Sequence, residues 1–490
     1  MLFNSFNFLV FFPVVVLLYY LLPQRYRNFL LLAASIYYFM DFIPAYAMIL
    51  LAAVAISYGT GLLIAGSQGG LRTVWFTIGT AMLCGILLVF KYYGFIGQNL
   101  AHLSRAIGWN YGLPSLRLAL PIGISFFTFK AISYLVEVRR GNLPPERNVV
   151  VHALYIAFYP GLLAGPIDRP QHLLPQFHEE HRFYYGQVAD GLKLMAWGMF
   201  KKIVVADRLA EYVNLVYAEP GKYHGWPAIL ASYFFAFQIY CDFSGYTDIA
   251  RGAARVMGFR LTENFRRPYF AKSISEFWTR WHISLSSWFR DYVYLPINYA
   301  LLRTLEGKGW RRTDLGAYAI AAMATMALAG LWHGASWNFV VWGILFGAYM
   351  VISVLTKRRR RSITNTLGLG KQQALHRTLK VLVTFHLVLL AWVFFRASDL
   401  PAAFTMLRSM ADVSWQRPGI NIIDSFSLLV SLASIAILTT ADLIQRRTSA
   451  SALLQRMPTA LRWGLYYSLA MAIILFGKIY SKQQFIYFQF

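Results

Sequence analysis

The sequence predicts an all-α integral membrane protein with about 11–13 membrane-spanning helices. Hydrophobic residues make up 58% of the 490 residues and charged residues only 14%, whereas a soluble domain has about 25% charged residues. These charged residues gather in clusters between long apolar runs. Because a soluble chain of this length needs a polar surface that so few charges cannot cover, we exclude a soluble fold.

Apolar runs define the expected helices, and most come close to the roughly 20 residues that a spanning helix needs. They lie at residues 3–22, 28–40, 45–65, 73–93, 119–137, 187–206, 227–250, 315–332, 336–356, 378–396, 425–444 and 461–479. Basic loops, such as residues 357–361, alternate with loops of little or mixed charge. Since cytoplasmic loops are enriched in Lys and Arg, this alternation predicts a multi-pass protein with both termini outside. We expect one polytopic domain over residues 1–490, with its motifs at about 119–356 and further C-terminal helices at 378–490.

The net charge is +25, from 46 Lys and Arg against 21 Asp and Glu. Such a balance is typical of nucleic-acid-binding proteins and also of membrane proteins with basic cytoplasmic loops. The basic residues here flank the apolar runs and form no separate basic domain. We therefore expect the lipid bilayer as a partner and no nucleic acid, because phosphate binding needs a continuous basic face.

No residue pattern indicates a metal site. Cys84 and Cys241 are far apart in apolar stretches, so they form neither a disulfide framework nor a CxxC motif. His172, His178 and His181 lie in a polar loop. We expect these three histidines to be solvated rather than to bind a metal.

Two segments do not fit simple spans. Residues 149–166 are apolar but contain a Tyr-Pro-Gly sequence at 159–161, so we expect a helix there to break. Broken backbone at membrane depth is tolerated only when it is buried in protein or lines a wet cavity. Residues 265–299 are too polar to span but carry an apolar stripe at helical spacing, with Glu276 and Arg280 placed to pair away from it. We predict a re-entrant or amphipathic helix on the cytoplasmic face or between spans.

His333 is the most informative single residue. It follows one apolar run and precedes another, and residues 316–356 contain no charged residue. An isolated ionisable group at membrane depth is costly and indicates function, although a histidine bonded to a backbone carbonyl or lying at the membrane rim fits the same pattern. Gly330 and Gly334 permit close approach of a ligand or another backbone, and Trp332 is placed to line a pocket.

His282 lies on the apolar stripe of the amphipathic segment, four residues after Trp278 and three before Leu285. An apolar-facing histidine is more often a structural residue than a catalytic one. Spacing alone therefore leaves both roles open for His282.

A polar cluster follows the apolar run at 227–250. Asp242 and Asp248 stand near its end, and Ser244-Gly245 predicts a helix break. Half-helix ends with nearby polar groups are a common basis for binding sites in membranes. The alternative is a polar helix terminus at the cytoplasmic interface, with Asp242 paired to an arginine.

Four motifs carry a resemblance to a known family. They are Arg280-Trp281-His282-Ile283-Ser284-Leu285-Ser286, Trp332-His333-Gly334, Tyr240-Cys241-Asp242-Phe243-Ser244-Gly245-Tyr246 and the opening Phe3-Asn4-Ser5. In combination they resemble the membrane-bound O-acyltransferases, in particular the branch of bacterial alginate O-acetylation membrane proteins. The resemblance covers almost the whole chain, in order.

The resemblance implies a ring of helices around a central funnel, with His333 as the catalytic histidine and His282 as a second functional one. It implies an acetyl thioester, acetyl-CoA, as the donor used from the cytoplasm, with no tightly bound cofactor. It also implies a place in the bacterial inner membrane and a periplasmic acetyltransferase partner that modifies an exopolysaccharide such as alginate or cellulose. We expect the residues that accompany the histidines in these motifs to bind substrate: Trp332, Trp281, Asp242, Tyr240, Ser244 and Arg280.

Acyl transfer suits a neutral histidine. The hydroxyl proton must leave as the new C–O bond forms, and a histidine acting as the general base contributes about 10²–10⁴-fold. Apolar surroundings favour the neutral ring that this role requires, but His333 is equally able to be acylated itself. A transporter also fits polar breaks inside a membrane, although it usually shows several intramembrane charges or repeated halves. A non-catalytic scaffold for the periplasmic enzyme is the third reading.

Overall fold

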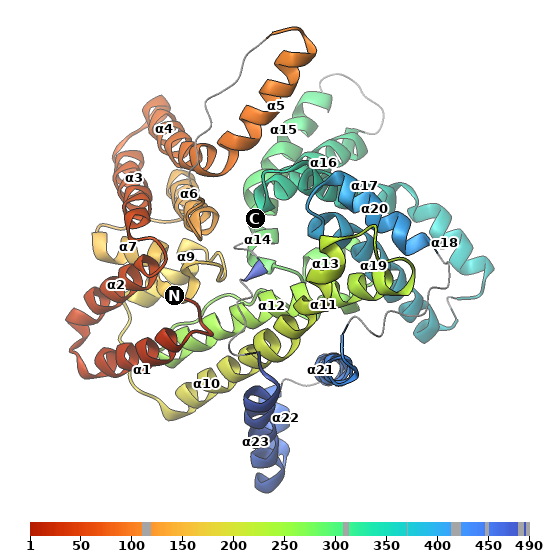
Figure 1. The fold of residues 1–490 in the computed structure, drawn as a ribbon. Helices are drawn as coiled ribbons and strands as arrows, with labels where there is room; N and C mark the ends of the chain where they lie inside the picture. The colour runs from red at the N-terminus through yellow and green to blue at the C-terminus, as the bar shows by residue number, and fades with distance from the viewer. Residues whose placement is uncertain are drawn as a thin grey trace. The chain divides into compact units, whose positions relative to one another are not determined.

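A computed structural model describes residues 1–109, 119–306, 313–369, 371–412, 423–445, 450–478 and 485–486. Within these residues every regular element is a helix and there is no β-strand (Figure 1). The predicted all-α class is therefore confirmed. The chain divides into two compact units, one formed by Met1–Met195 and Tyr246–Glu263 and the other by Ala196–Gly245 and Asn264–Phe490. We describe them below as the first and second unit.

The helices of the first unit, with two that continue into the second, are α1 (Phe6–Leu21), α2 (Gln24–Met40), α3 (Ala47–Gly66), α4 (Gly69–Leu87), η2 (Leu88–Tyr92), α5 (Tyr93–Ala106), α6 (Ile124–Arg140), α7 (Val149–Ala157), α8 (Tyr159–Leu162), α9 (Pro170–Leu173), α10 (Tyr185–Met199) and α12 (Trp226–Val256). The second unit contains η4 (Phe200–Ala206), α11 (Asp207–Ala218), α13 (Ile274–Trp278), α14 (Ile283–Phe289), η6 (Arg290–Tyr294), α15 (Leu295–Glu306), α16 (Thr313–His333), α17 (Trp337–Leu355), α18 (Lys357–Thr366), α19 (Gln373–Arg396), α20 (Leu400–Ala411), α21 (Ser425–Ile444), α22 (Ala450–Arg456) and α23 (Thr459–Phe476).

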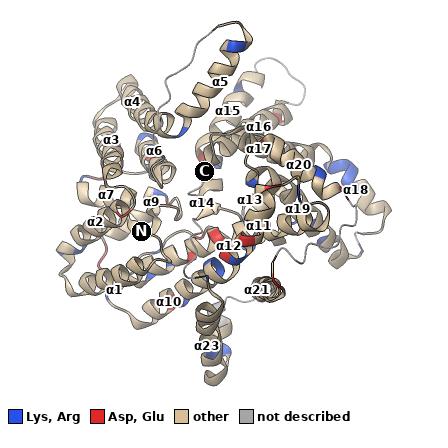
Figure 2. Ribbon diagram, in the orientation of Figure 1, with Lys and Arg blue, Asp and Glu red and all other residues tan. Residues whose placement is uncertain are grey.

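Seven helices of the described chain are long and apolar enough to cross a membrane, so the protein is a multi-pass membrane protein. They are Pro44–Gly66, Gly69–Ala106, Thr313–His333, Trp337–Leu355, Gln373–Arg396, Ser425–Ile444 and Thr459–Phe476. Fewer of the predicted runs qualify because α1 and α2, at 16 and 17 residues, are short for the roughly 20 residues of a span. Similarly, α6 is 17 residues long and carries the buried Lys130 and Glu137. Basic residues gather on α18, directly after the span α17 (Figure 2), as cytoplasmic loops require.

The first unit confirms the predicted break in residues 149–166. Helix α7 begins at the cap Asn148, ends at Ala157, and α8 starts at Tyr159 with a proline in its first turn. Both helices are buried almost throughout, so the broken backbone is covered by protein, as membrane depth requires. Nearby, α3 packs against α4 and α6 (Figure 1).

In the second unit α16 and α17 form a tight antiparallel pair that matches the predicted runs 315–332 and 336–356. Glycines allow the close approach of the two backbones. A Cβ on Gly330 would overlap the carbonyl oxygen of Phe339, and one on Gly343 would overlap that of Met326. The close approach of another backbone that was predicted at Gly330 is confirmed.

The amphipathic segment 265–299 differs from the single helix that its stripe predicted. It consists of the short helices α13 and α14, followed by η6 and α15. The break falls at His282, whose φ of 43° lies in the left-handed region. The stripe residues Phe277 and Leu285 are buried in the unit, so this segment covers protein rather than lying on the membrane surface.

The predicted helix break at Ser244-Gly245 is wrong, because α12 runs unbroken over 31 residues. Gly245 serves helix packing instead. A Cβ there would lie 2.7 Å from the Gly198 carbonyl oxygen and 3.1 Å from the Lys202 amide nitrogen. The glycine therefore lets the backbone at the start of η4 pack closely against α12, next to the buried lysines Lys201 and Lys202.

Candidate active site

His333 is the last residue of α16 and is enclosed by aromatic rings. Its side chain is 5% exposed. The ring lies edge-on to Trp332 and Trp342, each with centroids 4.9 Å away, and to Phe395 at 5.2 Å. Helix α17, through Trp342, and helix α19, through Phe395, thus supply aromatic neighbours that bury the imidazole.

His282 lies in the same unit, fully buried at the first residue before α14. Its ring meets Phe243 edge-on at 4.6 Å and Trp332 at 6.2 Å. Trp332 is therefore an aromatic neighbour of both histidines. The structure brings together the two histidines that the sequence left in separate segments.

Two physical features set His282 apart. Burial lowers the pKa of its imidazole to about 3, so the ring is neutral at physiological pH. Its left-handed backbone costs about 1–3 kcal/mol for a residue other than glycine, and such strain gathers at functional sites.

Of the other predicted residues, Trp281 and Tyr240 belong to the same aromatic cluster. Trp281 is 1% exposed and lies 5.0 Å from Trp392, which stacks at 6.0 Å on Trp342, the neighbour of His333. The Tyr240 ring is 6.3 Å from that of Trp281, and its hydroxyl donates to Asp442 at 3.1 Å. These rings give the pocket a continuous aromatic wall.

Asp242 and Ser244 contact lysines rather than the histidines. Lys202 forms ion pairs of 2.7 Å with both Asp242 and Asp207, and Lys201 donates to Ser244 at 3.0 Å. Asp242 also accepts a 2.7 Å bond from the Ile486 amide. Asp242 is the residue before Phe243, whose ring contacts that of His282. This buried network therefore supports a neighbour of His282 rather than contacting the histidine itself.

The sequence interpretation missed Lys201, Lys202 and Asp207. The two lysines stand in the stretch 187–206 that was taken for an apolar run, and Asp207 directly follows it. The signal was present, since charges at membrane depth are rare and mark functional or paired groups. The Arg280 guanidinium bonds Glu276 at 2.6 Å, as the helical spacing predicted, and its contact with substrate stays a prediction.

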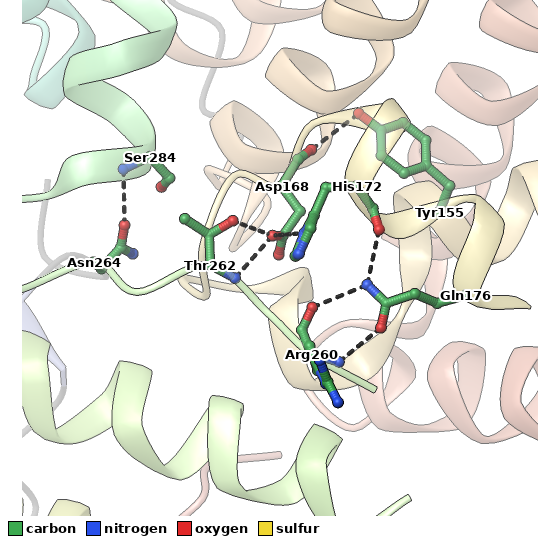
Figure 3. A network of polar contacts seen from close by, with 8 residues as sticks. All are labelled: Tyr155, Asp168, His172, Gln176, Arg260, Thr262, Asn264 and Ser284. Atoms are coloured by element: carbon green, nitrogen blue, oxygen red, sulfur yellow. Dashed lines mark hydrogen bonds and ion pairs between the residues drawn. The ribbon is translucent and has the colours of Figure 1, made fainter. Parts of the chain in front are cut away.

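A second polar network lies in the first unit (Figure 3). Asp168 is fully buried and accepts from the Thr262 amide at 2.9 Å, from the Thr262 hydroxyl at 2.5 Å and from His172 at 3.1 Å. The bond to Asp168 raises the pKa of His172, against the opposing effect of burial. His172 and His178 are exposed, as predicted, whereas the prediction is wrong for His181, which is half-buried with its ring 4.5 Å from that of Phe259. No group of three potential ligands for a metal occurs in the described part of the chain.

This arrangement defines a class of protein. A multi-pass helical membrane protein holds two buried histidines that share one tryptophan as a neighbour, within a cluster of aromatic rings. Imidazoles in such a place are suited to take a proton from a hydroxyl or to accept an acyl group.

Comparison with known proteins identifies the family. Residues 148–398, which contain both histidines, match the membrane-bound O-acyltransferase family. The chain is 37% identical over 418 residues to the probable alginate O-acetylase AlgI of Azotobacter vinelandii, covering 83% of this chain and 77% of that protein. It is 35% identical to the probable alginate O-acetylase AlgI of Pseudomonas aeruginosa, covering 89% and 80%. It is also 30% identical to the peptidoglycan O-acetyltransferase of Helicobacter pylori, covering 84% and 80%. The chain therefore belongs to the membrane-bound O-acyltransferase family and is an acyltransferase.

Proposed function

We propose that this protein moves acetyl groups from a cytoplasmic thioester, acetyl-CoA, across a bacterial inner membrane for O-acetylation of a secreted polysaccharide of the alginate class. The observation that carries the proposal is the pair of buried histidines that share Trp332 as an aromatic neighbour, within the segment that matches the family. Two relatives are named as probable alginate O-acetylases and one as a peptidoglycan O-acetyltransferase, which supports acetyl as the group transferred.

His333 acts as the base in this proposal. It takes the acceptor's hydroxyl proton while the oxygen attacks the thioester carbonyl. The C–S bond then breaks, and the leaving thiolate takes that proton from the His333 imidazolium, which restores the neutral ring. The aromatic enclosure keeps water from competing for the acyl group. A route in which His333 is acylated first and then deacylated by the hydroxyl uses the same residues.

Neighbouring residues have separate tasks. Trp332, Trp281 and Tyr240 form the wall against which the acyl group and thioester lie. Asp242 and Ser244 hold α12, the helix that carries Tyr240, in place through their bonds to Lys202 and Lys201. Arg280, about a quarter exposed, is placed to meet the phosphates of the donor.

The polymer itself requires another protein. We propose that a periplasmic acetyltransferase receives the acetyl group and binds the exopolysaccharide, while the membrane helices form the predicted ring around a funnel. No cofactor beyond the acetyl-CoA substrate enters this scheme.

The test is transfer of labelled acetyl from acetyl-CoA by purified protein in lipid nanodiscs, with wild type beside His333→Ala. We expect the variant to fold and to lose about 10²-fold or more of the rate, as loss of a general base does. His386→Ala is the matched control, because His386 lies in the span α19 and bonds Tyr233, outside the histidine pair. A His333→Ala rate above about a tenth of wild type contradicts the base role. If wild type transfers no acetyl but conducts solutes in liposomes, the protein is a transporter. If it shows neither activity, the remaining interpretation is a non-catalytic scaffold for the periplasmic enzyme.

A further inference from the structure

The left-handed backbone at His282 needs support from elsewhere in the fold. His282 is one of two non-glycine residues with positive φ in the described chain, the other being Arg267. It is also the residue before α14, and its own side chain makes no capping bond to that helix. The amides of the first turn of α14 must therefore find acceptors on another segment.

Asn264 supplies those acceptors. Its backbone carbonyl accepts from the Ile283 amide at 2.9 Å, and its side-chain Oδ1 accepts from the Ser284 amide at 3.1 Å (Figure 3). Asn264 is 1% exposed. Asn264, which lies 18 positions before His282 in the chain, thus caps α14 in place of the histidine. It does so at the two amides that directly follow His282.

The residues after Asn264 extend this contact along the segment before His282. The Arg266 amide donates to the Arg280 carbonyl at 2.9 Å, and the Phe265 ring meets Trp281 edge-on at 5.0 Å. Bonds on both sides of His282 therefore hold its backbone, and Asn264 is the member that acts through a side chain.

Only the oxygen of the Asn264 amide has a hydrogen bond among the described residues, since Nδ2 is buried without one. The role that the structure shows for this side chain is therefore that of an acceptor at a helix N-terminus. Aspartate serves this role equally well, and its charge is favoured there by the helix dipole. Alanine offers no acceptor.

We propose that Asn264 is a positioning residue for acyl transfer, which fixes the buried imidazole of His282 by capping α14 in its place. This inference rests on the proposed function for its effect on rate, and on geometry alone for its effect on His282. Removal of the cap lets the histidine leave its place against Phe243 and Trp332. A small displacement of a reacting or supporting group is enough to slow catalysis strongly.

The experiment compares wild type, Asn264→Ala, Asn264→Asp and Asn148→Ala in nanodiscs. Asn148 is a matched control, because its side chain caps α7 in the first unit by accepting from the Val150 and Val151 amides. We expect Asn264→Ala to lower kcat about 10–100-fold with little change in KM. Asn264→Asp should stay within about threefold of wild type, and Asn148→Ala should keep the wild-type kcat while losing thermal stability.

A second readout does not depend on activity. Diethylpyrocarbonate modifies accessible neutral imidazoles, and mass spectrometry gives the rate at His282 itself. We expect a rate about tenfold higher in Asn264→Ala than in wild type, with Asn264→Asp and Asn148→Ala unchanged.

If wild type transfers no acetyl, the proposed function fails and this readout alone decides the inference. Equal reactivity of His282 in wild type and Asn264→Ala overturns it, as does an Asn264→Asp variant that is as damaged as Asn264→Ala. An equal loss of kcat in Asn148→Ala also overturns it.

Discussion

The Trp332 indole joins the two parts of the site at the scale of single residues. It lies 4.9 Å from the His333 ring and 6.2 Å from the His282 ring. Asp242, the residue before Phe243, shares the buried Lys202 with Asp207. The site thus combines aromatic neighbours of the histidines with a buried cluster of charged residues.

Breaking the buried ion pair should destabilise the protein strongly. Asp242→Asn leaves Lys202 with one carboxylate in a buried place and weakens the bond from the Ile486 amide, and a hydrogen bond to a charged group contributes about 1.5–3 kcal/mol. We expect a lower thermal unfolding midpoint in detergent, measured by intrinsic tryptophan fluorescence. Asp190→Asn is the control, since Asp190 bonds Lys193 and Arg255 at a partly exposed place, where pairs contribute about 0–1 kcal/mol. Equal shifts for the two variants would contradict the buried role of Asp242.

His172 predicts a pH dependence of stability. Its bond to Asp168 raises the folded-state pKa above the ordinary value of 6.5, so folding favours the protonated ring. The stabilisation is fully present below about pH 6.5 and is lost as the pH rises through the raised pKa. The difference in unfolding midpoint between wild type and His172→Gln should therefore be largest near pH 6 and shrink toward about pH 9.

The control for this titration is His102→Gln, at an exposed histidine that bonds Arg105 rather than a carboxylate. A difference between wild type and His172→Gln that stays constant or grows with pH would show that the Asp168 bond does not favour the charged ring.

At the scale of elements, the pair α16 and α17 places His333. Their close contact depends on glycine, because the Gly343 Cα faces the Met326 carbonyl and the Gly330 Cα faces that of Phe339. Since His333 ends α16 and Trp342 precedes Gly343 on α17, the spacing of the two helices sets the distance between that histidine and its aromatic wall. A change in the packing of α16 against α17 should therefore also change the geometry around His333.

Gly343→Ala should separate the helices and lower both stability and acetyl transfer. The added methyl group overlaps the Met326 carbonyl oxygen, and such overpacking costs about 1–3 kcal/mol. Gly464→Ala in the span α23 is the control, because nothing lies within 4 Å of its added Cβ and alanine is the better helix former by about 1 kcal/mol. Unfolding midpoints and transfer rates should change in Gly343→Ala and not fall in Gly464→Ala. A Gly343→Ala variant with wild-type values of both would contradict the packing account.

At the scale of the whole molecule, the apolar residues have two different surroundings, the lipid hydrocarbon and the protein interior. Helix α23 buries none of its apolar residues within the described structure, as a helix that faces hydrocarbon does. The aromatic cluster around the histidines is buried in protein. The same residue types thus cover the outside of the protein and line its reaction site.

The biological product is tested in a bacterial strain that lacks this gene. We expect the acetate content of its secreted polysaccharide to fall, to return with the wild-type gene, and not to return with His333→Ala. Acetate released by mild alkali and measured by chromatography gives the result. Unchanged acetylation of the secreted polysaccharide, with altered acetylation of peptidoglycan, would move the acceptor to the wall polymer that the Helicobacter pylori relative is named for.

The sequence by itself determined the membrane class, the helices α16 and α17, the break after Ala157 and the selection of His333 as a candidate residue. These features follow from local quantities, namely the hydrophobicity of a run, the placement of proline and the isolation of one ionisable group, which a single stretch of chain carries. The functional role predicted for His282 came from the family resemblance, because its spacing left a structural role open. Only the tertiary structure decided that Trp332 is a neighbour of both histidines, that α12 is unbroken and that His282 adopts a left-handed backbone capped by Asn264. Ring contacts, ion pairs such as Lys202 with Asp242, and close packing at Gly245 depend on residues far apart in the chain. Their energy is realised only when the helices meet, so no local pattern carries it.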